Sequence, residues 1–274
     1  MTIDDHDFNY VRQLVRERAA IVLDDGKQYL VDNRLSILAR REGLGSAREV
    51  IQRLRAAPTG PLQRKVVEAM TTTETLFFRD GKPYEALRNT IIPELQRLRA
   101  AERKVQIWSC ACSSGQEPYS VGMLLREHFP ALASWQLRMV ATDLSTEMLA
   151  RSRAGRYSQL EVDRGLPGGY LGKYFDKIGH DWQISNDLRR MIEFRQLNLA
   201  GPWSHMPPVD LILLRNVLIY FDLDTKRQIL AKVRRALRPG GFLILGTAET
   251  TMNLDDGFDL MRSDGTSYYR VRSG

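Results

Sequence analysis

The chain has 274 residues, of which 43% are hydrophobic, and its formal net charge is +7. This length suits one large core with a smaller appended domain. No apolar run reaches the ~18 residues of a membrane span, and the segment MTIDDHDFNY has no signal-peptide character, so we expect a soluble, cytoplasmic protein that does not insert into a membrane. The histidines and cysteines lack metal-ligand spacing, so we expect no metal site.

Residues 1–85 are predicted to form an all-α domain. Apolar residues recur at helical spacing from Phe8 onward. Residues 43–45 and 58–61, which are rich in glycine and proline, break this pattern into separate helices.

Positive charge is concentrated in this domain. Between Arg34 and Lys65, eight basic residues stand against two acidic ones. The segment lacks the interleaved aromatic residues of a surface that binds single-stranded nucleic acid. It is either a solvated helical face or a docking surface for an acidic protein, and the second interpretation assigns docking to Arg40, Arg41, Arg48, Arg53 and Arg55.

Residues 86–274 are predicted to form an α/β domain. After a helix at 84–99, apolar strands alternate with helices, which is typical of a parallel sheet with crossover helices. The expected strands are 105–109, 137–142, 191–195, 209–214 and 242–246. Residues 157–190 interrupt the alternation and read as an insertion, with a helix near 170–174 and short antiparallel strands flanking Gly179.

The segment VQIWSCACSSGQEPYSV, residues 105–121, is a strand that leads through a turn into a helix. In open α/β sheets, ligands bind beyond the carboxyl ends of the strands, where the N–H groups of the next helix are free. Only Gly115 is present and G-x-G-x-x-G is absent, so an ordinary strand-to-helix corner remains an alternative. Cys110 and Cys112 are expected to be reduced packing residues, since two cysteines so close on one strand pair poorly.

Polar residues at neighbouring strand ends indicate the ligand. Asp143 ends the second strand and can accept both hydroxyls of a ribose, or it can simply cap the next helix. Glu117 lies in the first turn of a helix and can accept from a ligand ammonium, or merely favour the helix dipole. Arg215 and Asn216 end the strand at 209–214 and should line the same cleft. Two acids in these places favour a cationic ligand that carries a ribose.

Five strings of the sequence carry a family resemblance. They are TTTETLFFRD, WSCACSSGQEPYS, VATDLSTEML, FRQLNL and LILLRNVLIYF. Their order and spacing resemble those of the CheR family of bacterial chemotaxis methyltransferases, which use S-adenosylmethionine to methylate receptor glutamates. The resemblance covers nearly the whole chain. It implies a Rossmann-like class I methyltransferase sheet, an N-terminal all-α domain and a small antiparallel β-subdomain.

The resemblance also implies roles for individual residues. Glu117 would bind the cofactor's ammonium, Asp143 the ribose hydroxyls, and Tyr220 would lie near the transferred methyl group. The family often has asparagine where this chain has Thr73, so a hydroxyl would replace an amide there. The remaining cofactor contacts would be Thr75 and Arg79 at the methionine end, Asn198 and Leu199 beside the adenine, and Arg215 and Asn216 at the floor.

The implied activity is transfer of a methyl group to glutamate carboxylates in the cytoplasmic helical domain of chemoreceptors, with S-adenosylhomocysteine as product. We expect a monomer that binds no nucleic acid. A nucleic-acid methyltransferase of the same fold and a non-catalytic cofactor-sensing adaptor are the alternatives. Residues 175–188 are several residues shorter than in members that dock on a receptor's C-terminal pentapeptide, so we expect receptors without that peptide.

Overall fold

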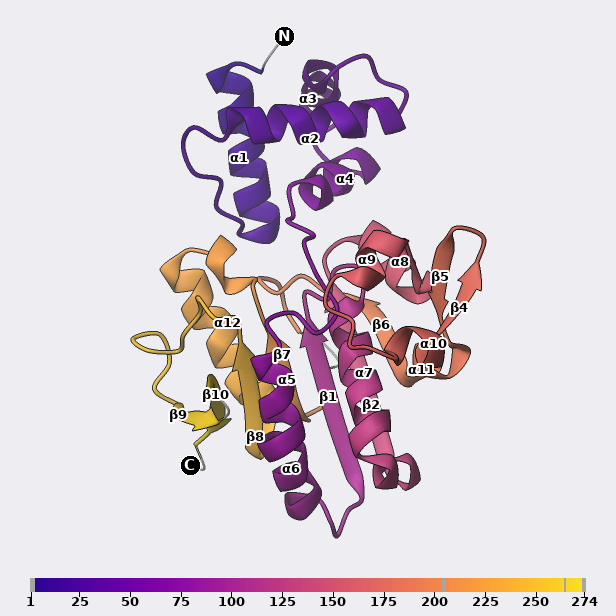
Figure 1. Cartoon of the computed structure of the whole chain (residues 1–274). Coiled ribbons are helices and arrows are strands. Elements are labelled where there is room, and N and C mark those ends of the chain that lie inside the picture. The colour runs from indigo at the N-terminus through magenta and orange to yellow at the C-terminus, as the bar shows by residue number, and fades with distance from the viewer. Residues whose placement is uncertain (1–2, 204–205, 264, 273–274) are drawn as a thin grey trace. The chain divides into compact units, whose positions relative to one another are not determined.

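The computed structural model describes residues 3–203, 206–263 and 265–272, and the chain divides into two compact units (Figure 1). The first comprises Met1–Thr72 with Tyr220–Thr225, and the second comprises Thr73–Ile219 with Lys226–Gly274. This division falls before the predicted boundary at 85/86, because Phe77, Tyr84 and Leu87 belong to the core of the second unit.

The first unit is helical, as predicted. Its helices are α1 (Asp5–Ala19), α2 (Gln28–Arg41), α3 (Ala47–Ala56) and α4 (Pro61–Ala69). The side chains of Asp4 and Ser46 cap α1 and α3, and Pro61 opens α4, where its missing N–H removes no helical bond. Apolar residues such as Val11, Leu35 and Ile51 are fully buried between the helices.

A mostly parallel sheet forms the centre of the second unit. Among the described residues it has seven strands in the order β6-β2-β1-β7-β8-β10-β9. The predicted strands are all present, as β1 (Lys104–Cys110), β2 (Gln136–Asp143), β6 (Ile192–Gln196), β7 (Val209–Leu214) and β8 (Leu237–Leu245). Since β6, β2, β1, β7 and β8 pair in parallel, their carboxyl ends meet at one edge.

Two features of this sheet were not predicted. An antiparallel hairpin, β9 (Phe258–Ser263) and β10 (Thr266–Val271), extends the sheet beyond β8. It lacks a long apolar run because β9 is at the edge and exposes most of its side chains. In addition, β8 begins at Leu237 rather than at residue 242, and residues 238–241 form an irregularity within this strand, where Gly240 has φ 74°.

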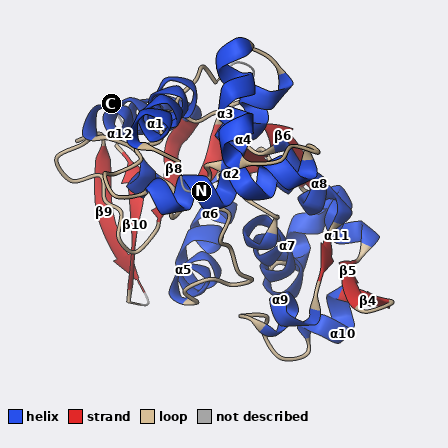
Figure 2. Ribbon diagram, turned by 90° about the horizontal axis from the view of Figure 1, so that it is seen from above, coloured by secondary structure: helices blue, strands red, loops and turns tan. Residues whose placement is uncertain are grey.

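Helices cover the sheet, and its central strands β1 and β7 are buried at nearly every position. Figures 1 and 2 show α5 (Lys82–Ala86), α6 (Ile92–Leu98) and α7 (Gln116–His128) on one face. The helix predicted at 84–99 is divided by a π-helical segment, Leu87–Ile91, just before Pro93, which has no N–H to donate. Helices α8 (Thr146–Ala154) and α12 (Leu223–Ala236) follow β2 and β7.

The insertion has the predicted form. Helix α10 (Tyr170–Tyr174) precedes strands β4 (Phe175–Ile178) and β5 (Asp181–Ile184), which pair antiparallel around Gly179. Strand β3 (Arg156–Tyr157) completes a small sheet of order β3-β5-β4, and helices α9 (Gln159–Asp163) and α11 (Asn186–Met191) flank it. Phe77 packs edge-on against Tyr157 and Phe175, which joins the loop at 71–80 to this subdomain.

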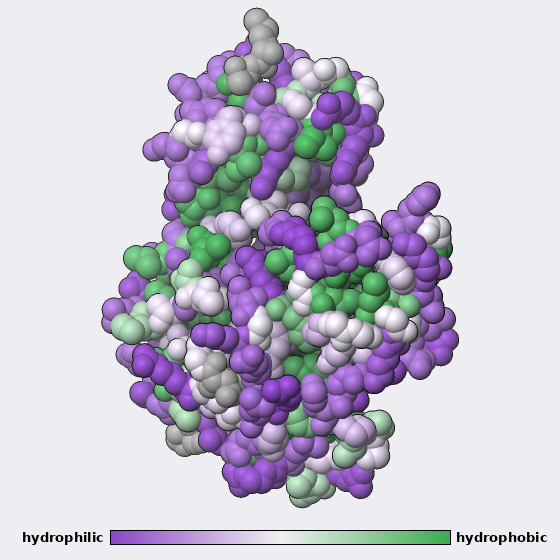
Figure 3. Space-filling model, viewed as in Figure 1, coloured by the Kyte–Doolittle hydropathy of each residue, from purple (hydrophilic) through white to green (hydrophobic). Residues whose placement is uncertain are grey.

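The surface drawn in Figure 3 is mainly hydrophilic, with hydrophobic residues scattered between. In the part of the chain that the structure describes, no helix combines the length and apolar character needed to cross a membrane.

A buried ion pair anchors the sheet. Asp210 on β7 is fully buried, and its carboxylate accepts from Arg99 Nε at 2.7 Å and from the N–H of Gln106 at 2.8 Å. Arg99 also donates to the carbonyl of Pro239 at 2.9 Å. One charged cluster therefore connects α6 with β1, β7 and β8.

Replacing Arg99 with leucine should destabilise the second unit. The change leaves the buried Asp210 carboxylate with only the longer contact to Arg238, at 3.4 Å. Breaking a buried ion pair typically costs up to about 3–5 kcal/mol. Urea unfolding measures the loss. Arg97→Leu is the control, because Arg97 forms an exposed pair with Glu94 and its loss should hardly move the midpoint. Equal shifts of the urea midpoint in the two variants would contradict a stabilising role for the buried Arg99–Asp210 pair.

Candidate cofactor-binding site

The carboxyl ends of β1 and β2 are tied together by Asp143. Its Oδ2 accepts from the N–H of Ser113, in the loop after β1, and its Oδ1 accepts from the N–H of Ser145, both at 2.8 Å. The Asp143 carbonyl accepts from Leu197 N–H at 2.9 Å, which places Asn198 next in the chain. Asp143 therefore holds the turn into α8, and the same carboxylate also faces the loop after β1.

This loop is tightly turned. Ala111 and Ser113 have φ of 51° and 49°, and Gly115, at φ 95°, has room for no side chain because a Cβ would lie 3.0 Å from Ser152 Oγ. Ser113 Oγ donates to the carbonyl of Thr73 at 2.7 Å. The structure thus brings the backbone of Thr73 into contact with the loop, and among the described residues no hydrogen bond is seen between Thr75 and this loop.

Arg215 is the centre of a buried charge cluster. Its Nη1 lies 3.0 Å from Glu117 Oε2, and its Nη2 lies 2.7 Å from Asp80 Oδ2 and 2.9 Å from the carbonyl of Arg79. Glu117 also accepts from Ser109 Oγ at 2.8 Å. Burial by itself lowers the pKa of Arg215, but Glu117, Tyr84 and Asp80 raise it above its usual value, so the guanidinium stays charged.

Other predicted residues occupy the neighbouring loops. Arg79 donates from Nη1 to the carbonyl of Glu74 at 3.1 Å. Asn198 Oδ1 accepts from the N–H of Ala200 at 3.0 Å, and Leu199 is buried. Asn216 has the left-handed φ of 58° and its N–H donates to Glu249. Tyr220 belongs to the first unit, where its carbonyl accepts from the N–H of Val22 at 2.9 Å.

The sequence prediction missed Asp80, Tyr84 and Glu249. Asp80 is the last residue of the string TTTETLFFRD, but the sequence does not show that it pairs with Arg215. The ring of Tyr84 lies 5.8 Å from the Arg215 guanidinium. No spacing in the sequence distinguishes Glu249, which lies in a turn after β8.

The side chains present fit a cationic cofactor with a ribose. Asp143 and Glu117 provide carboxylates, and among the described residues the buried Tyr84 hydroxyl and Arg215 Nε have no hydrogen-bond partner. Burial, and then Glu117, raise the pKa of Tyr84, so its hydroxyl is neutral and can donate. Most buried polar groups are hydrogen-bonded, so unpaired ones beside Glu117 and Arg215 are unusual.

The proposed docking residues are less free than the sequence suggested. Arg48 pairs with Asp4 at 3.0 Å, and Arg55 pairs with Asp7 at 3.0 Å. Arg53 pairs with Glu49 within α3. Arg40 and Arg41 are exposed in the last turn of α2. In the described part of the chain, the cluster of side chains that could hold a metal ion is Asp4, His6 and Asp7. Arg48 and Arg55 already form ion pairs with its two carboxylates.

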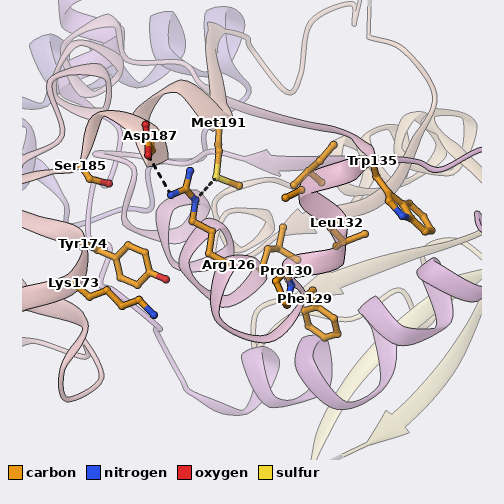
Figure 4. A pocket seen from close by; sticks show the side chains of 13 residues that line it. Arg126, Phe129, Pro130, Leu132, Trp135, Lys173, Tyr174, Ser185, Asp187 and Met191 are labelled. Carbon is orange, nitrogen blue, oxygen red and sulfur yellow. Dashed lines mark hydrogen bonds and ion pairs between the residues drawn. The ribbon is translucent and has the colours of Figure 1, made fainter.

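A pocket of about 730 Å³ lies elsewhere in the second unit (Figure 4). It is lined by the end of α7 and the start of β2, so it is at the opposite end of β2 from Asp143. Figure 4 shows Arg126 directed toward Asp187 and the sulfur of Met191. Lys173 at the same pocket pairs with Glu127. None of the predicted cofactor-binding residues lines this pocket.

This fold and these acids define an α/β protein that binds a nucleoside cofactor, and the comparisons identify it further. Residues 73–266 match the family described as "CheR methyltransferase, SAM binding domain", and residues 6–71 match "CheR methyltransferase, all-alpha domain". The chain belongs to the CheR family and is a chemotaxis methyltransferase that uses S-adenosylmethionine.

Full-length relatives agree. Chemotaxis protein methyltransferase Cher2 of Pseudomonas putida and chemotaxis protein methyltransferase 1 of Pseudomonas aeruginosa are each 40% identical over 99% of this chain and 100% of their own length. The chemotaxis protein methyltransferase of Vibrio parahaemolyticus is 36% identical over 99% of each chain.

Cys110 and Cys112 are free and buried, as predicted. Burial raises the pKa of both thiols, and the neighbouring charge of Glu117, with Asp143 for Cys112, raises it further. Both thiols therefore stay protonated in the folded protein.

Iodoacetamide should hardly react with the native protein. Unfolded cysteines ionise near pH 8.5, whereas the folded thiols keep their protons at that pH. The unfolded chain thus releases protons that the native chain retains, so these groups lower stability as pH rises above about 8.5. Mass spectrometry of native and urea-unfolded samples gives the rates. If the two thiols react with iodoacetamide as fast in the native protein as in the unfolded chain, they are not buried as the structure describes.

Proposed function

We propose that this enzyme transfers the methyl group of S-adenosylmethionine to glutamate side chains in the cytoplasmic helical domain of chemoreceptors. The observation that carries the proposal is the placement of two buried carboxylates in a CheR fold: Asp143 at the carboxyl end of β2, and Glu117 in the first turn of α7, the helix that follows the adjacent strand β1. A cationic cofactor with ribose hydroxyls is the ligand that such acids suit. We further propose that the enzyme acts as a monomer in the cytoplasm and binds no nucleic acid.

In this proposal, each residue holds one part of the cofactor. Asp143 accepts the ribose hydroxyls and Glu117 the ammonium, while Asn198 and Leu199 flank the adenine. Arg215 keeps Glu117 oriented, because its guanidinium bridges Glu117 and Asp80. The methionine end of the cofactor is contacted by Arg79, Thr75 and Thr73. Arg215 and Asn216 form the floor.

The chemistry asks for positioning rather than for a base. The bound cofactor supplies a methyl group already activated by a sulfonium. A glutamate side chain, with a pKa of about 4.3, is already an anionic nucleophile at neutral pH. The chain must align the carboxylate oxygen with the methyl group and exclude water, and such alignment is worth about 7–11 kcal/mol. Tyr220 is proposed to lie near the transferred methyl.

Radiolabelled S-adenosylmethionine tests the proposal. We expect the enzyme to place label on receptor cytoplasmic fragments as base-labile methyl esters. Label on RNA instead would show a nucleic-acid methyltransferase. Cofactor binding without transfer to any receptor fragment would show an adaptor.

Asp143→Ala should weaken cofactor binding by at least about tenfold, because hydrogen bonds to a charged group are worth about 1.5–3 kcal/mol each. Calorimetry with S-adenosylhomocysteine measures the affinity. Asp143→Asn is the control for folding, since its amide oxygen can still accept one of the loop N–H groups. If folded Asp143→Ala binds S-adenosylhomocysteine with wild-type affinity, Asp143 only holds the loops in place and does not bind the cofactor.

The basic face of the first unit is proposed to dock on an acidic receptor surface. The ion pairs of Arg48, Arg53 and Arg55 make them poor probes, because reversing their charge would also disturb Asp4, Asp7 and Glu49. We choose Arg40 and Arg41 as probes because both side chains are exposed in the last turn of α2.

Arg40→Glu combined with Arg41→Glu should raise the receptor KM several-fold and leave cofactor affinity unchanged. The wild-type rate should also fall with salt, since exposed charges are screened. Arg190→Glu with Arg262→Glu makes the same charge change on exposed residues of the second unit and should leave KM unaltered. Equal effects of the two pairs would point to net charge rather than docking.

The insertion bears on receptor choice. Members that dock on a receptor's C-terminal pentapeptide do so by strand addition, in which backbone hydrogen bonds supply affinity. Here β4 is an outer strand of the small sheet and covers only Phe175–Ile178, with a tight turn at Gly179. This strand offers little backbone to pair, although its edge is open.

We therefore expect receptors without the pentapeptide to be methylated, and the free peptide to bind weakly or not at all. Titrating a receptor C-terminal pentapeptide by calorimetry checks this. Binding at micromolar Kd, about −8 kcal/mol, would overturn it and show that the short edge suffices.

A further inference from the structure

Glu249 joins two strand ends through backbone hydrogen bonds. Its Oε1 accepts from the N–H groups of Val217 at 2.8 Å and Leu218 at 2.7 Å. Its Oε2 accepts from the N–H groups of Asn216 at 2.8 Å and Gly246 at 2.7 Å. The segments after β7 and β8 thus converge on one half-buried carboxylate.

The backbone around this carboxylate has little freedom. Asn216 has φ 58°, a left-handed conformation that costs a non-glycine residue energy unless its surroundings hold it. A Cβ on Gly246 would lie 2.7 Å from Glu249 Oε2 and 2.8 Å from Asn216 Nδ2. The carboxylate, the glycine and the left-handed turn therefore fit one another.

A carboxylate suits this place better than any neutral side chain. It has only acceptors, on two oxygens, so it can take N–H groups from both sides. Glutamine would turn an NH₂ donor toward backbone donors. The hydrogen bonds are also charge-assisted and therefore stronger than neutral ones.

We propose that Glu249 is a positioning residue for the cofactor. It fixes the left-handed turn that carries Asn216 and that follows directly from Arg215, the residue whose guanidinium holds Glu117. Loosening this turn moves the floor of the site without removing any group that touches the cofactor. The inference rests on the proposed placement of the cofactor against Arg215 and Asn216.

Glu249→Gln provides the test. It replaces one carboxylate oxygen, which accepts hydrogen bonds, with an NH₂ group and keeps the size and shape of the side chain. We expect the Kd for S-adenosylhomocysteine to rise about tenfold to a hundredfold, and the receptor KM to stay at the wild-type value. Gly246→Ala, which keeps the carboxylate but crowds the turn, should act in the same direction. The control is Glu161→Gln, because Glu161 also accepts a backbone N–H, from Ser158, at a helix start that plays no part in the proposed site.

Thermal unfolding of each variant separates positioning from folding. A folded Glu249→Gln protein that binds with wild-type affinity, or one that raises the receptor KM as much as the cofactor Kd, overturns the proposal. Asp143→Ala is measured beside it. If that variant loses affinity while Glu249→Gln does not, only the role of Glu249 fails; if neither loses affinity, the proposed cofactor site fails as well.

Discussion

The ion cluster around Arg215 is the constraint on which the second unit's site depends. A guanidinium this deeply buried must be compensated, and the compensating groups come from two segments: Glu117 from α7, and the Asp80 carboxylate and Arg79 carbonyl from the loop before α5. A buried charge that loses its partner is costly, so these segments are held in one arrangement. This arrangement leaves Glu117 beside the ends of β1 and β7, where a parallel sheet places its ligands.

A second pair of carboxylates organises the rest of that edge. Asp143 accepts N–H groups from the loop after β1 and the turn into α8, and Glu249 accepts N–H groups from the segments after β7 and β8. These acceptor-only side chains hold the loops in place, which suits a reaction that relies on alignment.

Charge in the first unit is organised differently. The basic residues between Arg34 and Lys65 suggested either a solvated helical face or a docking surface, and the structure pairs Arg48 and Arg55 with Asp4 and Asp7. These acids come from the start of α1, far away in sequence. Arg40 and Arg41 lie exposed in the last turn of α2, where their charge also suits the helix dipole.

The sequence by itself determined most of the elements and indicated which polar residues stand at the carboxyl ends of the strands. Strand and helix patterns located β1, β2, β6, β7 and β8, because buried parallel strands are continuous apolar runs, and they located the insertion by the loss of that pattern. Asp143, Glu117 and Arg215 were found because strand ends can be located along the chain. Only the tertiary structure decided which side chains meet. Glu249 and Asp80 act through contacts with residues far away in sequence, and the exposed edge hairpin of β9 and β10 has no apolar run to reveal it. Pairing across the fold depends on geometry that no local pattern encodes.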